Sequence, residues 1–382
     1  MFLRSAWAVG EMLFSGKPRP GADDGWLILP RLDGIGDFWL WLPFVSSLKK
    51  VFPHRKLHLL ANVLWAEPAQ LTGLFDRVTP LSPQKLLRSP AYRRQIWALL
   101  KTSPPGFLLH TTFRRRIAVE DSLAWFYPAS KRYTSPRTAD ALESPLVAHY
   151  LDTVLYDRAV RLSQDFSHQW EGYQAFLSHL GYERLDYTIY IKLKAIWPGP
   201  TLKLPERYLV FLPGAGAAYR KPDPSLVSRL LQTSWERLRI PFLILGTLAD
   251  RPYVQQAVHL LPCEAVYDLL GYTSLVETLS LITRAEAVIG PETGLTHAAA
   301  TWDRPTLILM GGGHWGRFFP YPESFSHQPF ILRHPMPCYG CGWFCQYTLS
   351  RDKPYPCMAA LAQASMEPFY QWLSAISARR TE

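Results

Sequence analysis

The sequence predicts an α/β protein built from two doubly wound domains. Short apolar runs alternate with longer stretches of helical periodicity, a pattern typical of repeated strand–helix units and parallel sheets. The alternation starts at Trp26, is interrupted by a proline-rich segment, and then begins again. A chain of 382 residues is also longer than a single hydrophobic core usually supports. We therefore expect one domain at 26–194, a linker at 195–207 and a second domain at 208–335.

The first expected domain begins with a strand–helix–strand unit. Its predicted elements are a strand in WLILP (26–30), a helix at about 37–51, a strand in LHLL (57–60), a helix near 64–74 and a strand at 106–111. Residues 112–190 alternate between aromatic and polar stretches and predict no definite element. The preceding residues 1–25 form an N-terminal extension. There we expect a short, partly amphipathic helix that packs on the domain or touches lipid head groups.

The second expected domain repeats the alternation more clearly. Its predicted elements are a strand in YLVFLP (208–213), a helix near 225–237, a strand in PFLILG (241–246), a helix near 250–260, a strand in AEAVIG (285–290), a helix from about 294 and a strand in PTLILMG (305–311). A cysteine-rich segment, 336–357, follows, and a helix at about 358–378 lies in the last part of the chain, 358–382. In open sheets of this class ligands bind at the carboxyl ends of strands, so the loops after the strands are informative.

The composition indicates a globular protein. The chain is 48% hydrophobic and 19% charged, and it contains no run of about 18 apolar residues that would span a bilayer. The 41 Lys+Arg and 31 Asp+Glu give a net charge of +10, which favours a polyanionic partner: nucleic acid, an anionic membrane face or a phosphorylated substrate. Five cysteines, four of them between 338 and 357, do not resemble a disulfide scaffold, so we expect a reducing, cytoplasmic location.

The stretch RLDGIGDFWLWLP (31–43) places a carboxylate, Asp37, between a glycine loop and an apolar run. In one interpretation Asp37 is the N-cap of a helix that starts at Phe38, because a short oxygen acceptor satisfies the first amides of a helix. In the other, the glycines, Gly36 among them, bring the backbone and the carboxylate close to a ligand. The two interpretations are compatible, and the loops of the second domain bear on the choice.

One loop of the second domain, GAGAAYRKPDP (214–224), has the composition of a phosphate-binding turn. Small residues such as Gly214 and Ala217 let backbone amides approach phosphate oxygens, and the helix start that follows adds positive potential. The loop ends in two cations, Arg220 and Lys221. A tight turn without a ligand is the alternative.

A second loop, PETGLTHAAA (291–300), provides amides and a hydroxyl at a helix start, where a diphosphate would bind. The residues concerned are Thr293, Gly294 and Leu295, with His297 on the first turn of the helix. Simple capping by Glu292 and Thr293, and a packing role for His297, are the alternatives. Two loops of this kind in one domain favour a nucleotide ligand.

Four stretches of the sequence together resemble one known family. They are RLDGIGDFWLWLP, PGAGAAYRKPDP, DLLGYTSLVETLSLITRAEAVIGPETGLTHAAA and RFFPY. In this order and spacing, over about 26–50 and 207–322, they are similar to the motifs of glycosyltransferase family 9, the ADP-heptose:lipopolysaccharide heptosyltransferases. The resemblance implies the GT-B fold: two facing Rossmann-like domains, the first for the acceptor and the second for the nucleotide sugar, with a C-terminal crossover helix. The sequence departs from the family at Glu292, where aspartate is usual, and lacks the tryptophan after the phosphate-binding lysine.

The resemblance also implies an inverting transfer of a heptose from a nucleotide donor, ADP-heptose, to a lipopolysaccharide core or another glycan. Asp37 would take the proton of the acceptor hydroxyl as the C–O bond forms. The implied donor-binding residues are Glu292, Thr293, Gly294, Leu295 and His297 at the diphosphate, Arg220 or Lys221 as the basic residue, Asp250 at the ribose and Thr273 at the base. No Asp-x-Asp pair occurs, so we expect catalysis without a divalent metal, with the helix ends and the basic pair neutralising the leaving group.

Arginines of the first domain are candidates for acceptor binding. FRRR (113–116) contributes Arg114, Arg115 and Arg116, and guanidinium groups bind phosphates through paired hydrogen bonds. With Gly36, they would suit a phosphorylated lipopolysaccharide core. A solvated basic face explains them equally well. The implied location is the cytoplasm, or the inner face of the inner membrane as a peripheral protein on its anionic surface.

The cysteines of CYGCGWFC and the PC that follows predict a structural metal site. Cys338 and Cys341 have the C-x2-C spacing that lets two thiolates bind one ion, and Cys345 and Cys357 complete a set of four sulfurs. Four sulfurs suit tetrahedral Zn²⁺, or iron as a single ion or a cluster. Two disulfides or free buried thiols are the alternatives.

Two other functions stay open on the sequence alone. One is a protein O-heptosyltransferase of the same fold, since the acceptor leaves no clear pattern. The other is a non-enzymatic metal–thiolate protein that binds nucleic acid, supported by the net charge of +10 and the cysteines. The sequence contains no stretch with the spacing of a known groove-reading module, so we expect no nucleic-acid partner.

Overall fold

The computed structural model describes residues 10–12, 14–16, 21–135, 145–160, 168–347, 350 and 352–379. The chain forms two compact units, Met1–Phe166 with Trp170–Asp186, and Ser167–Gln169 with Tyr187–Glu382. The main division falls between Asp186 and Tyr187, before the boundary expected at 194. The start of the expected linker is part of the second unit, where the ring of Trp197 lies 5.4 Å from that of Trp302.

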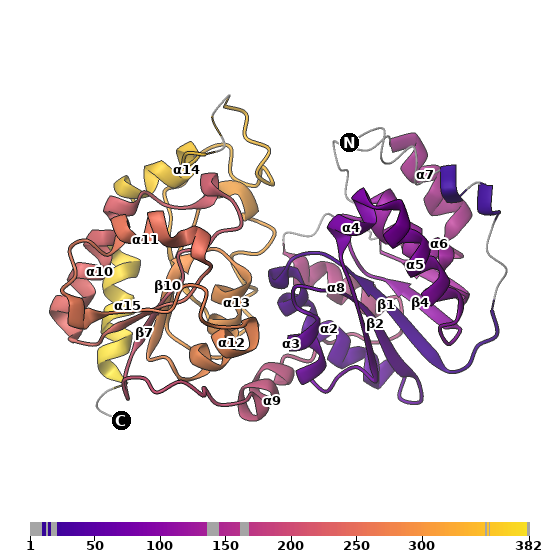
Figure 1. Ribbon diagram of the computed structural model, residues 1–382, viewed down its shortest axis with the longest axis horizontal. Coiled ribbons are helices and arrows are strands. Elements are labelled where there is room, and N and C mark those ends of the chain that lie inside the picture. Colours follow the sequence, from indigo (N-terminus) through magenta and orange to yellow (C-terminus); the bar gives the residue numbers. More distant parts are fainter. Residues whose placement is uncertain are drawn as a thin grey trace. The chain divides into compact units, whose positions relative to one another are not determined.

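The first unit is built on a six-stranded parallel sheet with the strand order β3-β2-β1-β4-β5-β6. The strands are β1 Trp26–Arg31, β2 Lys56–Asn62, β3 Arg77–Leu81, β4 Gly106–His110, β5 Ala129–Thr134 and β6 Arg158–Ala159. The helices are α2 Ile35–Val51, α3 Ala66–Leu71, α4 Pro83–Arg88, α5 Pro90–Lys101, α6 Ser122–Phe126, α7 Pro145–Leu155 and α8 Gln169–Ser178, with a π-helical turn at Ile117–Asp121. Figure 1 shows β1, β2 and β4 with helices beside them.

The second unit repeats this plan with a six-stranded sheet in the order β12-β11-β10-β7-β8-β9. The strands are β7 Leu209–Phe211, β8 Phe242–Ile244, β9 Val266–Asp268, β10 Ala287–Pro291, β11 Thr306–Leu309 and β12 Phe330–Leu332. The α-helices are α9 Thr188–Ile196, α10 Pro224–Leu238, α11 Arg251–Ala257, α12 Leu275–Arg284, α13 Gly294–Thr301, α14 Pro356–Ala359 and α15 Glu367–Ala378. Short 3₁₀ turns occupy Ala218–Arg220, Leu248–Asp250, Cys263–Ala265, Gly312–His314 and Ala360–Gln363.

The prediction of two doubly wound domains is confirmed. In each unit the first strand of the sheet pairs on one side with the second strand and on the other with the fourth, so the strand order reverses beside it. This reversal is the topological switch point at which such sheets bind ligands. The loop after β1 and the loop after β4 flank the switch point of the first sheet. The loops after β7 and β10, which are the two predicted phosphate loops, flank that of the second.

The strongly apolar elements are the ones that the sequence predicts. β1 and β10 are buried along almost their whole length and α2 is buried over 38–48, and their Leu, Ile, Val and Trp side chains fill the two cores. The strands that the sequence does not predict are short or polar: β5 has the sequence ASKRYT, and β9 has only three residues. Such strands lack the apolar run on which the prediction depends.

The helix predicted near the C-terminus is α15, and it is built into the second unit. Its residues Phe369, Trp372 and Ile376 are buried in that unit's core, and the indole Nε1 of Trp372 donates to the carbonyl of Pro305. Figure 1 shows α15 beside the second sheet, where it contacts β11 and β12. The helix is therefore part of the second unit. The crossover helix that the resemblance implied would instead pack on the first domain.

The described part of the N-terminal extension packs on the first unit. Met12 is fully buried in its core, and Glu11 lies 3.0 Å from the guanidinium of Arg93. The rest of the predicted helix at 1–9, and residues 17–20, lie outside the described residues. No helix in the described part of the chain has the length and apolar character to cross a bilayer.

Candidate functional site

The glycine loop after β1 places Asp37 on the first turn of α2. The helix begins at Ile35 with Gly34 as its N-cap, and no side chain caps it. The capping interpretation of Asp37 is therefore wrong, because the helix starts earlier than the sequence predicts. The half-buried carboxylate of Asp37 lies over Gly34, where an added Cβ would be 3.5 Å from its Oδ2 atom. Gly36, on the same turn, is also half-buried.

A buried arginine fixes this loop. Arg31 is 1% exposed, and its guanidinium makes two contacts of 3.0 and 2.9 Å to the carboxylate of Asp33. It also donates to the backbone carbonyl of Asp37 at 3.2 Å. The backbone carbonyl of Asp33 accepts two further hydrogen bonds, one from the Nε1 atom of Trp65 at 2.9 Å and one from the side chain of Asn62. The carboxylate of Asp37 is thus presented on a backbone held at several points.

Asp33 is a second carboxylate of this loop that the sequence analysis missed. Burial raises the pKa of Asp33 to about 7, and the neighbouring carboxylates of Asp37 and Glu120 add to the rise, while Arg31 opposes it. Near neutral pH, Asp33 therefore carries less negative charge than an ordinary aspartate. Its position, two residues after the strand in RLDGIGD, is the only sequence signal that could have identified it.

The arginines predicted to bind the acceptor are largely used inside the first unit. Arg115 is fully buried and donates to Asp121, to Asp152 and to the carbonyl of Ser135. Arg116 pairs with the buried Glu120, with a contact of 2.6 Å. The prediction is corrected for these two arginines, because they satisfy buried carboxylates and carbonyls. Arg114 is exposed.

In the second unit, the candidate site centres on a buried carboxylate, Glu292, at the end of β10. Its Oε2 atom accepts from the guanidinium of Arg220 at 2.8 Å and from Nδ1 of His314 at 2.8 Å. Its Oε1 atom lies 3.4 Å from Nε2 of His297. Arg220 also donates to the backbone carbonyl of Glu292 at 3.2 Å. The carboxylate thereby joins the loops that follow β7, β10 and β11.

The electrostatics of this cluster keep Glu292 charged. Burial alone would raise its pKa, but His314, His297 and Arg220 outweigh burial and hold the pKa well below the usual range of a glutamate. Burial lowers the pKa of His314, and the attraction of Glu292 only partly offsets this. His314 is therefore mainly neutral at pH 7. Arg220 supplies the permanent positive charge opposite Glu292.

His297 does not line an open site. Its side chain is fully buried, its ring stacks on Phe319 at 4.7 Å, and its Nδ1 atom lies 2.7 Å from the hydroxyl of Tyr321. His297 contacts Glu292 from within the core, so the packing alternative holds. The predicted contact of His297 with a diphosphate is wrong, because the side chain is not accessible. The helix α13 is N-capped by Thr293. Leu295, the second residue of this helix, is half-buried.

Lys221 and Asp250 form a second acid–base pair next to the first loop. The ammonium of Lys221 lies 2.6 Å from Oδ1 of Asp250, and the other carboxylate oxygen accepts from the amide and hydroxyl of Thr247. These contacts hold the pKa of Asp250 below its usual value against the opposing effect of burial. Asp250 is therefore occupied by protein partners, and the prediction that it binds a ribose needs one of them to be released. An added Cβ at Gly214 would lie 3.6 Å from this carboxylate.

Of the remaining predicted donor residues, Ala217 and Gly294 belong to the segments after β7 and β10, and Thr273 lies on the loop between β9 and α12. The hydroxyl of Thr273 is 2.9 Å from that of Thr278, and Ala217 has an extended backbone before the turn that carries Arg220. Gly294, the first residue of α13, is buried. The structure thus brings the residues after β7 and β10 together through Arg220 and Glu292.

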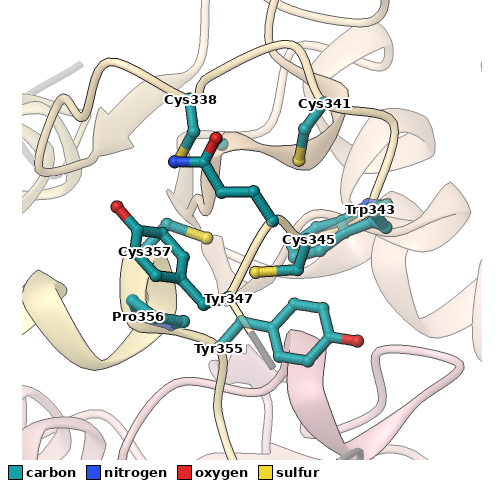
Figure 2. A pocket seen from close by; sticks show the side chains of 10 residues that line it. Cys338, Cys341, Trp343, Cys345, Tyr347, Tyr355, Pro356 and Cys357 are labelled. Carbon is teal, nitrogen blue, oxygen red and sulfur yellow. The ribbon is translucent and has the colours of Figure 1, made fainter. Parts of the chain in front are cut away.

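The four cysteines line one pocket, together with Trp343 and Tyr355. Figure 2 shows the side chains of Cys338, Cys341, Cys345 and Cys357 turned toward the same space. Burial raises the pKa of Cys341 and of Cys357, and the neighbouring thiols add to both rises. Even so, the described residues contain no three His, Cys, Asp or Glu side chains placed so that they could hold a metal ion. The donor set suits a metal, but the sulfurs as placed do not converge on one point.

Comparison with known proteins finds one family model that matches part of the chain. The model of glycosyltransferase family 9 (heptosyltransferase) matches residues 201–339 and confirms the resemblance predicted from the sequence. No curated protein sequence matches the chain.

Solved structures of heptosyltransferases share the fold. E. coli heptosyltransferase WaaC with ADP is 15% identical, with a TM-score of 0.64 over 92% of this chain and 99% of that one. E. coli ADP-heptose lps heptosyltransferase II is also 15% identical, with a TM-score of 0.60 over 94% and 100%. The dodecameric iron-containing E. coli heptosyltransferase TibC, in complex with ADP-D-beta-D-heptose, is 13% identical, with a TM-score of 0.52 over 94% and 78%. These similarities confirm the predicted GT-B class of the fold.

The buried carboxylate yields a prediction for stability. Because the pKa of Glu292 is lowered on folding, its contribution is present above the unfolded-state value, close to 4.5, and is lost as the pH falls through the folded-state value. Glu292→Gln should therefore reduce the free energy of unfolding by about 2 kcal/mol at pH 7. The difference from the wild type should shrink in acid below that value. Urea denaturation at pH 7 and in acid measures both.

The matched control is Asp268→Asn. Asp268 also pairs with an arginine, Arg251, at 2.6 Å, but both side chains are more than a third exposed. We expect a change below about 0.5 kcal/mol, as for surface ion pairs. Equal effects of the two substitutions at pH 7 would show that the Glu292 cluster has no special role in stability.

Proposed function

We propose that the chain is a glycosyltransferase of family 9 and that it transfers a heptose from ADP-heptose to a hydroxyl group with inversion at the anomeric carbon. The proposal rests on one observation: two loops meet at the switch point of the second sheet. Arg220 and Lys221 follow β7, and the N-terminus of α13 follows β10. Guanidinium, ammonium and helix amides together form a cradle suited to a diphosphate. The similar structures contain ADP or an ADP-heptose, which favours an adenine nucleotide over others.

In this proposal the leaving diphosphate is stabilised by cations and helix amides instead of a divalent metal. Arg220 and Lys221 are each oriented by an acid, Glu292 and Asp250, so they need little rearrangement when charge develops on the leaving oxygen. Asp37 accepts the proton of the acceptor hydroxyl, which attacks the anomeric carbon as the bond to the diphosphate breaks. Asp33, with its raised pKa, limits the negative charge beside Asp37.

The acceptor in this proposal is a glycan hydroxyl, as in the lipopolysaccharide core. The case for a phosphorylated acceptor is weaker than the sequence suggested, because Arg115 and Arg116 pair with carboxylates of their own unit. A serine or threonine hydroxyl of a protein is the alternative acceptor. Incubation of the enzyme with ADP-heptose and either truncated lipopolysaccharide or cell proteins, followed by mass spectrometry of both pools, distinguishes the two. A product in neither pool, and no hydrolysis of ADP-heptose, would refute the proposal.

We also propose that the protein works in the cytoplasm, at the inner face of the inner membrane. The net charge of +10 supports attraction to an anionic surface, and lipid-linked acceptors would be found there. Sedimentation with anionic vesicles that weakens with added salt is the expected behaviour. The +10 charge needs no nucleic-acid partner in this proposal.

The role of Asp37 leads to a first functional prediction. Asp37→Asn should lower turnover by roughly 100-fold or more, because the amide cannot accept the proton, while ADP affinity stays close to that of the wild type. Coupled ADP-release assays and calorimetry measure the two quantities. Asp23→Asn, which removes an exposed carboxylate of the same unit that pairs with Arg55, serves as the control and should keep normal turnover. Near-normal turnover of Asp37→Asn would rule Asp37 out as the base.

The metal-independent cradle leads to a second prediction. ADP affinity should survive EDTA and should fall as salt is added, because attraction to the charges of Arg220 and Lys221 contributes to it. Lys221→Ala should weaken ADP binding about tenfold, the scale of one charge-assisted hydrogen bond. Lys192→Ala, which removes an exposed lysine of α9, should leave it unchanged. Affinity that disappears in EDTA and returns with magnesium would contradict this mechanism.

We propose, further, that Cys338, Cys341, Cys345 and Cys357 hold a structural metal, Zn²⁺ or iron, once the sulfurs close on it. Their shared pocket and thiolate chemistry support this, and a similar heptosyltransferase is iron-containing. Such a metal would contribute folding free energy and no step of the transfer.

Elemental analysis of protein made without a histidine tag should find about one equivalent of zinc or iron, or several irons for a cluster. Cys341→Ser should lose the metal together with thermal stability. Cys263→Ser changes an exposed cysteine outside the pocket and should affect neither. Metal-free protein with four titratable thiols and an unchanged melting temperature in Cys341→Ser would exclude the metal site.

A further inference from the structure

Trp343 connects the cysteine pocket to the candidate donor site. It lies between Cys341 and Cys345 and lines the pocket, as Figure 2 shows. Its indole ring packs directly on the backbone of Gly313, where an added Cβ would lie 2.2 Å from the ring. The segment is fastened there by two backbone hydrogen bonds of 2.8 Å, from Gly340 to Gly312 and from Gly342 to Gly313.

The same indole contacts two of the three side chains that hold Glu292. The guanidinium carbon of Arg220 lies 5.0 Å from the centre of the Trp343 ring, within the range of a cation–π contact. The ring of His314 meets the indole edge-on, with centroids 5.8 Å apart. Arg220 is thereby held by the aromatic ring of one segment and the carboxylate of another.

Two N–H donors on these side chains have no acceptor among the residues that the structure describes. The Nε atom of Arg220 and the Nε1 atom of Trp343 are buried and make no hydrogen bond within the described part of the chain. Buried donors in proteins are normally satisfied by protein, water or ligand. In the proposal that follows, an oxygen of the donor diphosphate satisfies the Nε atom of Arg220.

We propose that Trp343 is a positioning residue for the donor: it holds the Arg220 guanidinium in the orientation that binds the diphosphate. This inference rests on the proposed function, because it assigns a role within the same donor site. Arginine loses rotamer entropy when it binds a phosphate, and a ring that fixes its plane beforehand reduces that cost. The loop of Arg220 has no tryptophan of its own, so the cysteine segment supplies the aromatic surface.

The test is the affinity for ADP, measured by calorimetry on the full chain. Trp343→Leu removes the aromatic face and should weaken ADP binding about tenfold, the scale of a partly desolvated cation–π contact. Trp343→Phe keeps an aromatic face and should stay within about threefold of the wild type. If Trp343→Leu fails to fold, Trp343→Gln takes its place with the same expected loss.

A double-substitution cycle separates positioning from a general structural effect. In the background of Arg220→Ala, Trp343→Leu should cause no further loss of ADP affinity, because the residue through which it acts is gone. The matched control is Trp235→Leu. Trp235 also lies under an arginine, Arg239, at 5.6 Å, but on α10, and its loss should leave ADP affinity unchanged.

The outcomes distinguish this inference from the proposed function. A wild-type protein that binds no nucleoside diphosphate would refute the proposed function and the inference with it. A wild-type protein that binds ADP, with a folded Trp343→Leu variant that binds it equally well, would refute the inference alone. Additive losses in the cycle would do the same, because Trp343 would then not act through Arg220.

Discussion

The burial of one carboxylate, Glu292, constrains the candidate site of the second unit. An ionised carboxylate away from water is tolerated only where charged or hydrogen-bonding partners surround it. Here those partners come from separate loops: Arg220 after β7, His297 on α13 and His314 after β11. Since moving any one of these segments away removes a partner from a buried charge, Glu292 holds the segments together at the switch point of the second sheet.

The arrangement of the cysteine segment follows from three glycines. The loop after β11 contains three consecutive glycines, Gly311, Gly312 and Gly313. An added Cβ at any of them would collide with Met358, Tyr339 or Trp343. The backbone of this loop is therefore the surface on which the cysteine segment packs. His314, the next residue, is directed to Glu292 by the same loop. Packing of the segment and geometry of the site are thus coupled through one short stretch of chain.

The sequence predicted the fold better than the roles of individual side chains. Apolar runs such as WLILP and AEAVIG identify buried parallel strands, and the loops that follow them identify the switch points. A charged residue in such a loop, however, has the same sequence signature whether it faces a ligand or a protein partner. Arg115 and His297 proved to be internal. The sequence could not show this, because their partners Asp152 and Tyr321 are distant along the chain and the pairs are visible only in the structure.

Trp343 illustrates the opposite failure. Nothing in CYGCGWFC indicates that its tryptophan contacts an arginine more than a hundred positions earlier, because this contact depends on the packing of a loop against a glycine backbone.

The two pairs Arg220–Glu292 and Lys221–Asp250 leave the cluster close to electrical neutrality. A diphosphate therefore gains less from charge than it would from two unpaired cations. It must compete for donors whose directions are already set, so affinity depends on how accurately rings and carboxylates orient those donors. In such a site, a residue that only orients a cation matters as much as the cation itself.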